Sequence, residues 1–255
     1  MPSPADSRRG VLVVVPARNE AARLGPALRG YLAEARRHPA LAVRFLVVLN
    51  GCSDRTQDAV ESLRREEPSL CWVRYDAAIG KGGAVLAGFR EPSEEPWLAF
   101  VDADGATPPA DFFRLLERAE GHAVAIAVRD MAARPSGRRI PSLLFNLCAR
   151  ALFLLPFADT QCGAKVFCRH LIDAVLPQMR ISGMAFDVEL LVRARRIGAR
   201  IHQEPVAWSD QGGSGVRILR TGAGMLLDLL RLRLGLAGRP VAERLPPAPD
   251  ARHAD

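Results

Sequence analysis

The segment WLAFVDADG, residues 97–105, joins an uninterrupted apolar run to two aspartates. Its first five residues have the composition of a strand buried on both faces, and the glycine at its end permits a turn. Asp102 and Asp104 therefore stand just past the carboxyl end of a buried strand, where both carboxylates can reach a hard divalent cation. The segment alone leaves a second interpretation open, in which one aspartate caps the helix that begins after Pro108.

Strand and helix patterns alternate along the rest of the first half. Most of its apolar runs are followed by residues with the spacing or the start signals of a helix. The runs that predict further buried strands are Val11–Val15, Phe45–Leu49, Cys71–Tyr75 and His122–Val128. This alternation predicts an α/β fold, with a mostly parallel sheet flanked by helices on both faces and ligands at the carboxyl ends of its strands.

The second half has weaker patterns. Arg129 to Arg139 contains four arginines and no apolar periodicity, which predicts a mobile loop. The elements expected after it are helices at Ile140–Leu155, Phe186–Ile197 and Gly222–Leu236, a strand at Ala164–Cys168, and a strand at Ala199–Trp208. Pro205 marks the last of these as an edge strand. Residues 238–255, rich in Pro and Ala, are interpreted as a disordered tail.

The composition of the 255 residues is that of a globular protein, with 49% hydrophobic and 25% charged residues. The net charge is +7, and only Lys81 and Lys165 are lysines, so the other 33 of the 35 basic residues are arginines. This bias reflects either a genome-wide preference for arginine or a surface that attracts phosphates or acidic lipids. A nucleic-acid-binding protein is disfavoured, because the arginines lack interleaved aromatic residues.

A glycine-rich segment, IGKGGAVLAGF at residues 79–89, suggests a phosphate-binding turn. It is not a dinucleotide fingerprint, since the third glycine position is Val85, and it is not a phosphate loop, since Gly82 stands where Ser or Thr is required. What remains is a glycine-rich turn that enters a helix with Lys81. Such a turn suits recognition of a diphosphate through backbone amides.

Taken in order, six motifs resemble the inverting GT-A glycosyltransferases of family 2. They are VVPARNE (14–20), VVLNGCSDRT (47–56), GKGGA (80–84), FVDADGAT (100–107), DTQCGAKVF (159–167) and FDVELL (186–191). The closest resemblance is to dolichyl-phosphate glucosyltransferases, followed by polyprenyl-phosphate mannose synthases, and it runs from about Val11 to Arg233. Two features depart from those families: the membrane-anchoring segments are absent, and Leu49-Asn50 replaces the usual acidic pair of the second motif.

The resemblance implies a donor site for a nucleoside diphosphate sugar. It assigns residues 1–237 to one GT-A domain, with a nucleotide-binding half at about 11–105 and an acceptor half at about 106–237. In the first half, Lys81 and a divalent cation, Mg²⁺ or Mn²⁺, held by the DxD motif at Asp102 and Asp104 neutralise the leaving diphosphate. Asn50 lies beside the base edge, where it can accept from the uracil N–H, which favours UDP over GDP. The residues expected near base and ribose are Pro16, Ala17 and Glu20.

The resemblance also implies a polyprenyl phosphate acceptor, glucose as the transferred hexose, and no nucleic-acid partner. It places the acceptor phosphate on Arg129 and on Arg138 or Arg139, with Asp159 and Gln161 organising the acceptor loop. A phosphate monoester is largely a dianion at neutral pH and needs no general base. Two alternatives stay open: transfer to a soluble hydroxyl acceptor, for which Asp187 would be the catalytic base, and GDP-mannose-dependent transfer to a polyprenyl phosphate.

We expect a cytoplasmic protein, peripheral at the inner face of the membrane. The apolar stretch Ser142–Ala158 is interrupted by polar residues, so it is no spanning helix, and residues 1–10 do not resemble a signal peptide. Two apolar stripes, within Leu143–Phe157 and Gly224–Leu236, either lie in the headgroup plane or pack on the sheet as core.

Overall fold

A seven-stranded sheet forms the centre of the computed structural model, which describes residues 9–129, 136–208, 218–235, 238 and 240–241. The spatial order of the strands is β3-β2-β1-β4-β6-β5-β7, and β6 alone runs antiparallel to its neighbours. The strands are β1 (Arg9–Ala17), β2 (Leu41–Asn50), β3 (Leu70–Tyr75), β4 (Trp97–Val101), β5 (Val124–Arg129), β6 (Ala164–Cys168) and β7 (Ile201–Val206). The predicted mostly parallel α/β sheet is confirmed.

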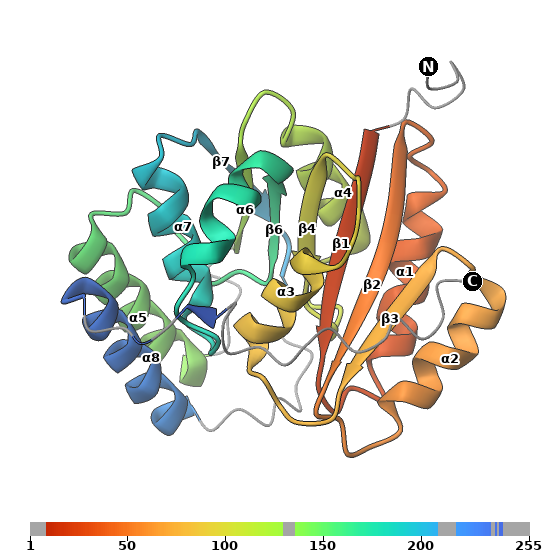
Figure 1. The fold of residues 1–255 in the computed structure, drawn as a ribbon, viewed down its shortest axis with the longest axis horizontal. Coiled ribbons are helices and arrows are strands. Elements are labelled where there is room, and N and C mark those ends of the chain that lie inside the picture. Colours follow the sequence, from red (N-terminus) through yellow and green to blue (C-terminus); the bar gives the residue numbers. More distant parts are fainter. Residues whose placement is uncertain (1–8, 130–135, 209–217, 236–237, 239, 242–255) are drawn as a thin grey trace.

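Helices cover both faces of this sheet (Figure 1). One face packs against α1 (Leu24–Ala35), α2 (Thr56–Glu66) and α4 (Pro109–Arg118). The other packs against α3 (Lys81–Arg90), α6 (Arg169–Val175) and α7 (Phe186–Arg196), with the short 3₁₀ helix Leu176–Gln178 after α6. Outside that layer, α5 (Ser136–Phe153) and α8 (Ile218–Arg233) pack against each other.

The central strands are apolar on both sides because both sides are covered. In β1, Val13 and its odd-numbered neighbours enter the core beneath α1 and α4, whereas Leu12 and Val14 enter the core beneath α3. Because successive side chains point to opposite faces of the sheet, one strand contributes to both cores, which explains the continuous apolar run in the sequence.

The antiparallel strand β6 brings an additional segment to the functional edge of the sheet. The carboxyl ends of β1, β2, β4 and β5 meet at one edge, and the residues that precede β6 arrive at the same edge because β6 runs the other way. Ala164 pairs with Val101, and the amide of Asp102 donates to the carbonyl oxygen of Gly163 at 2.9 Å. The DTQCG segment therefore lies directly beside the acidic pair.

The predicted strands lie where expected, and β7 is an edge strand, as Pro205 indicated. One prediction is wrong: Ser136 to Arg139, expected to continue a loop, already belong to α5. Arginine is a good helix former and a proline precedes Ser136, so the absence of apolar periodicity there did not exclude a helix start. Residues 130–135 of that expected loop, and residues 239 and 242–255 of the expected disordered tail, lie outside the described residues. Within the tail, Val241 is 1% exposed and its amide donates to the carbonyl oxygen of Met179 at 2.5 Å, so the chain packs against the domain at this residue.

Over its described residues, the chain has no helix that combines the length and the apolar character needed to span a membrane.

Candidate active site

The acidic pair follows β4 on a tight turn. The Oδ1 atom of Asp104 accepts a hydrogen bond from the amide of Ala106 at 3.0 Å, and Gly105 takes a positive φ of 71° that glycine tolerates best. The Oδ1 atom of Asp102 lies 2.6 Å from Nζ of Lys81, the first residue of α3. The structure therefore brings Asp102, Asp104 and Lys81 together, as the sequence predicted.

Negative charge is concentrated around this pair. Burial and the charge of Asp102 raise the pKa of Asp104. Burial also raises the pKa of Glu20, to which both aspartates add, although Arg23 binds the Glu20 carboxylate at 2.7 Å and opposes the shift. Burial disfavours the charged form of Lys81, but Asp102 and Asp187 outweigh it and leave the lysine pKa raised. The site thus favours a cation near Asp104.

This donor set fits a divalent cation held by two carboxylates. Hard cations such as Mg²⁺ are commonly bound by one or two carboxylates, with substrate phosphates and water completing the shell. No cluster of three or more His, Cys, Asp or Glu side chains that could hold a metal occurs in the described part of the chain. A cation held by Asp102 and Asp104 would therefore take its remaining ligands from substrate phosphates and water.

On the nucleotide side, the structure corrects the expected role of Asn50. Its Oδ1 accepts from the amide of Ile79 at 2.8 Å and its Nδ2 donates to the carbonyl oxygen of Gly80 at 3.0 Å. The side chain, in a residue that is 4% exposed, thus holds the glycine-rich turn and does not present an edge to a base. Ala17 is also fully buried, whereas Pro16 and Glu20 are partly exposed.

The glycine-rich turn itself packs against the start of α7. The amides of Gly82 and Gly83 donate to the carbonyl oxygens of Gly183 and Ser182, at 3.3 and 2.9 Å. These two amides are therefore engaged within the protein, contrary to the expected cradle of backbone amides for a diphosphate. A Cβ on Gly82 would lie 2.4 Å from Cβ of Phe186, so the glycine permits the close approach of the two helices. The group that the turn offers to a ligand is the Lys81 side chain.

On the acceptor side, Arg129 and Asp159 form a buried ion pair. Two guanidinium nitrogens of Arg129 contact the carboxylate at 2.5 and 2.8 Å, and its charge holds the pKa of Asp159 at about 2 despite burial. The amide of Gln161 donates to the same carboxylate at 3.0 Å, so these three predicted residues do lie together. The guanidinium also lies 5.5 Å from the centre of the Trp208 ring. Arg138 and Arg139 lie in the first turn of α5, and their side chains are outside the described structure.

Asp187, the candidate base, is buried in an ion pair that the sequence did not predict. Its carboxylate lies 3.1 Å from Nζ of Lys165, which is fully buried and also donates to the carbonyl oxygen of Cys162 at 2.6 Å. Burial raises the pKa of Asp187, while Lys165 and Lys81 oppose the rise. The only available signal for Lys165 was a lone lysine within the otherwise apolar strand AKVFC.

Gly163 is a second residue whose role the sequence did not reveal. A Cβ at this position would lie 2.0 Å from Oδ2 and 2.3 Å from Cγ of Asp102. The missing side chain therefore creates the space in which the Asp102 carboxylate lies. The signal in the sequence was its place in the DTQCG motif. Its position beside Asp102 follows from the pairing of β6 with β4.

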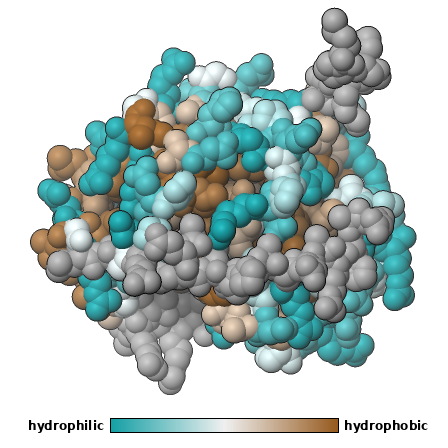
Figure 2. Space-filling model, viewed as in Figure 1, coloured by the Kyte–Doolittle hydropathy of each residue, from teal (hydrophilic) through white to brown (hydrophobic). Residues whose placement is uncertain are grey.

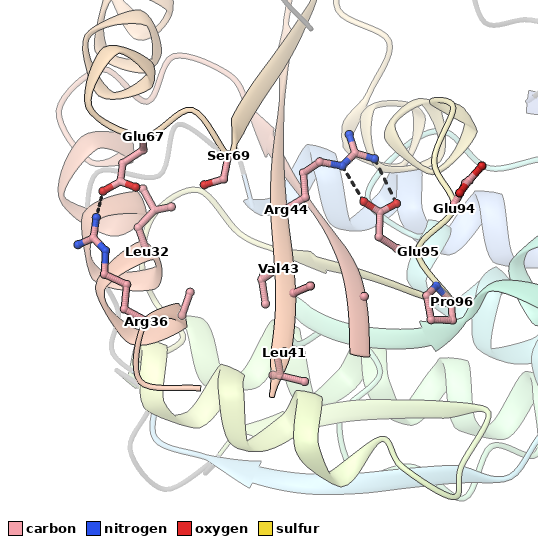
Figure 3. A pocket seen from close by; sticks show the side chains of 13 residues that line it. Leu32, Arg36, Leu41, Val43, Arg44, Glu67, Ser69, Glu94, Glu95 and Pro96 are labelled. Carbon is pink, nitrogen blue, oxygen red and sulfur yellow. Dashed lines mark hydrogen bonds and ion pairs between the residues drawn. The ribbon is translucent and has the colours of Figure 1, made fainter. Parts of the chain in front are cut away.

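Two pockets differ in their relation to this site. One of about 420 Å³ reaches Asp104 and is lined also by Arg23, Tyr31 and Pro109. A larger one of about 760 Å³ lies at the amino ends of the strands, between the ion pairs Arg44–Glu95 and Arg36–Glu67 (Figure 3). The larger pocket contains none of the predicted site residues, and the smaller one contains Asp104 alone among them, so neither pocket outlines the whole predicted site.

The fold and the acidic pair at its edge fit the sugar-transferring class of α/β enzymes that the six motifs resemble. Residues 12–170 match the model of glycosyl transferase family 2, and the chain belongs to this family. The expected GT-A family 2 identity and fold are thereby confirmed.

Relatives extend the match over most of the chain. It is 32% identical over 237 residues to the glycosyltransferase AglD of Haloferax volcanii, covering 90% of this chain but only 38% of that protein. It is 30% identical over 240 residues to the dolichyl-phosphate beta-glucosyltransferase ALG5A of Trichomonas vaginalis, covering 87% of this chain and 72% of that one. An undecaprenyl-phosphate mannosyltransferase of Micrococcus luteus is 29% identical over 246 residues, covering 89% and 99%.

Solved structures agree on the fold. The glucosyl-3-phosphoglycerate synthase of Mycobacterium tuberculosis, crystallised with Mn²⁺, UDP and glucosyl-3-phosphoglycerate, superposes with a TM-score of 0.65 at 20% identity. The superposition covers 90% of this chain and 81% of the synthase.

Proposed function

We propose that this chain transfers glucose, with inversion, from UDP-glucose to a polyprenyl phosphate at the inner face of a membrane. The names of its relatives, dolichyl-phosphate beta-glucosyltransferases and an undecaprenyl-phosphate mannosyltransferase, support the acceptor class. They support glucose as the hexose and leave mannose as the second candidate. The proposal assigns donor binding to residues 11–105 and acceptor binding to residues 106–237.

The observation that supports a phosphate acceptor most directly is the burial of Asp187, the candidate base of the hydroxyl-acceptor reaction. Asp187 is 2% exposed and paired with Lys165, and Asp159 is fully buried and paired with Arg129. A hydroxyl acceptor needs a carboxylate within hydrogen-bond reach of its proton. A phosphate monoester has a second pKa of about 6 and needs none.

Asp102, Asp104 and Lys81 would act on the donor. The two carboxylates would hold the cation, which supplies positive charge to the diphosphate when it is bound. Lys81 adds a second positive charge at the amino end of α3, where the helix dipole also favours an anion. We prefer UDP to GDP on the sequence resemblance, because the second motif lacks the usual acidic pair that could accept from the adjacent N–H donors of a guanine.

For the acceptor, we assign different roles to the three arginines. Arg129 fixes the Asp159–Gln161 segment and would place its positive charge beside the acceptor phosphate. Arg138 and Arg139 are proposed as the main phosphate ligands on the sequence resemblance, because paired guanidinium bonds suit a phosphate better than lysine does.

The experiment that tests this proposal compares two acceptors of the same polyprenyl chain length, one with a phosphate and one with a hydroxyl group. Purified protein with Mn²⁺ is given UDP-glucose or GDP-mannose, together with a short polyprenyl phosphate or the corresponding polyprenol. We expect transfer from UDP-glucose to the phosphate only. Equal transfer to the polyprenol, or to a soluble sugar, would replace the proposal with the hydroxyl-acceptor reaction.

A pair of variants separates catalysis from stability. Asp187→Asn and Glu189→Gln both disrupt buried ion pairs on α7, but Glu189 contacts Arg193 and backbone amides away from Lys81. Both variants should lower the thermal stability, and each folded enzyme should keep kcat for the phosphate acceptor within about tenfold. General bases contribute about 10²–10⁴-fold, so a loss of that size confined to Asp187→Asn would identify a base and refute a base-free transfer.

A further inference from the structure

Large apolar side chains are exposed in one region of the molecule. Of the eight large hydrophobic residues found exposed in the described structure, seven lie on α5, on α8, or just after one of these helices. Their exposed fractions run from 39% to 79%. We call them the leucine face: Leu143, Leu144, Leu147, Leu154, Leu227, Leu230 and Leu234.

The leucine face spans two neighbouring helices. Because α5 and α8 pack against each other, their exposed leucines belong to neighbouring helices. Brown, hydrophobic atoms gather at the left margin of Figure 2, where Figure 1 places α5 and α8. The sequence left open whether the two apolar stripes pack as core or lie in the headgroup plane of a membrane. Leu155, which is 3% exposed, packs in the core, but the leucines of this face do not.

Positive charge borders the leucine face. The sequence of α5 contains three arginines and no acidic residue, and α8 contains three arginines and one aspartate. Where these helices end beside α7, a groove of about 340 Å³ has an apolar floor formed by residues 152–155 and Val192. The charged residues that line this groove are Arg195, Arg196 and Arg233, with no acidic side chain among its lining residues.

Part of the leucine face lies on the same helix that supports the acceptor loop. Asn146 is buried on α5, and its Oδ1 accepts from the amide of Thr160 at 3.1 Å and from the Thr160 hydroxyl at 2.7 Å. Thr160 stands between Asp159 and Gln161 in the loop that Arg129 anchors. The exposed leucines of α5 and the side chain that holds this loop thus belong to one helix.

We propose that the leucine face and the arginines at its margin form a docking surface for an anionic lipid bilayer. The leucines enter the boundary between headgroups and acyl chains, and the arginines contact anionic headgroups, as in amphipathic helices that lie in the membrane plane. A second copy of this chain fits less well, because a symmetric contact would bring the same arginine-rich borders together with Asp228 as the single acidic residue of the two helices. The delivery of a polyprenyl phosphate across α5 rests on the proposed function, whereas the docking itself does not.

Vesicle co-sedimentation of the full chain tests the docking surface. The vesicles contain phosphatidylcholine alone or phosphatidylcholine with phosphatidylglycerol. We expect binding to the anionic vesicles that weakens as salt rises. Leu143→Ser with Leu147→Ser should weaken it at least tenfold, and circular dichroism and thermal stability should stay unchanged because both side chains are exposed.

Charge reversal provides a matched comparison. Arg231→Glu with Arg233→Glu should weaken binding at least about 30-fold, because the loss of each basic residue near a membrane costs about 1 kcal/mol and each new carboxylate is repelled. Arg37→Glu with Arg65→Glu, at exposed positions just after α1 and on α2, makes the same change of net charge and should have a much smaller effect. Equal losses in the two pairs would show that net charge, and not this surface, drives binding, and would overturn the proposal.

Two parallel measurements separate the remaining outcomes. Transfer to a short, water-dispersed polyprenyl phosphate should be unchanged in the leucine variant. If the wild type binds vesicles but transfers sugar to no polyprenyl phosphate, the proposed function alone is refuted. Sedimentation velocity of the wild type should show a monomer. A dimer that the leucine variant dissociates, without vesicle binding by the wild type, would make this face a subunit interface and overturn the docking surface.

Discussion

Replacement of Gly163 by alanine should inactivate the enzyme while leaving it folded. The new Cβ would lie 2.0 Å from Oδ2 of Asp102, whereas real Cβ atoms essentially never approach a heavy atom closer than 3.0 Å, so at least 1.0 Å of displacement is needed. Asp102 cannot yield freely, because Lys81 holds its carboxylate and the Gly163 carbonyl oxygen holds its amide. A misplacement of about 1 Å can cost about 100-fold in rate, or about 2.7 kcal/mol of transition-state stabilisation.

The assay is kcat/KM for the sugar donor with a water-dispersed acceptor, alongside thermal unfolding. Overpacking of this kind costs about 1–3 kcal/mol of stability, which a folded domain tolerates. Gly224→Ala is the matched control, since a Cβ there meets nothing within 4 Å and alanine in a helix is favoured by up to about 1 kcal/mol. A Gly163→Ala enzyme with wild-type kcat/KM and an unchanged requirement for the cation would refute the reasoning that Asp102 must occupy this space.

Three further predictions concern the charged groups of the site. Asp104→Ala should abolish turnover with little change in melting temperature, and excess EDTA should do the same to the wild type; full activity in EDTA would exclude the proposed cation. Because the pKa of Asp159 is lowered to about 2 in the folded protein from an ordinary value of 3.8, its ion pair stabilises the fold above about pH 4 and loses this effect as the pH falls toward 2. Asp159→Asn should therefore lower the free energy of unfolding at neutral pH by on the order of 2 kcal/mol, and a difference from the wild type that stays constant down to pH 2 in denaturant titrations would contradict this. Arg129→Ala should raise KM for the acceptor far more than KM for the donor, with partial recovery in Arg129→Lys, since lysine restores the charge but not the two parallel hydrogen bonds; a change in donor KM alone would argue against this placement.

Much of the fold could be predicted because it depends on local patterns. A strand covered on both faces must be apolar throughout, so β1 and β4 were recognisable from single runs. The position of Asp102 and Asp104 followed directly, since residues just past a parallel strand stand at the ligand-binding edge. Grouping of Arg129, Asp159 and Gln161 came from the motif resemblance, and the structure does bring them together.

The partners of polar groups could not be predicted in the same way. Asn50 bonds to Ile79 and Gly80, about 30 residues along the chain, and its residue type suits a base edge as well as it suits a backbone. Likewise, Asp187 has the residue type of a catalytic base, and only the pairing of β4 with β6 brings Lys165 to it. A residue type states which bonds a side chain can make, while the register of distant strands decides which it does make.

The antiparallel pairing of β6 determines where related chains can carry insertions or deletions. Its register pairs Phe100 with Lys165 and Val101 with Ala164. A residue lost between Asp159 and Ala164 would have to be compensated by a slip of the strand, and a slip of one position turns Lys165 away from Asp187 toward the opposite core. The same loss would withdraw Gly163 from Asp102. Insertions before Asp159 lengthen only the connection from α5, so related chains should differ in length there and keep a fixed spacing from Asp159 to Lys165.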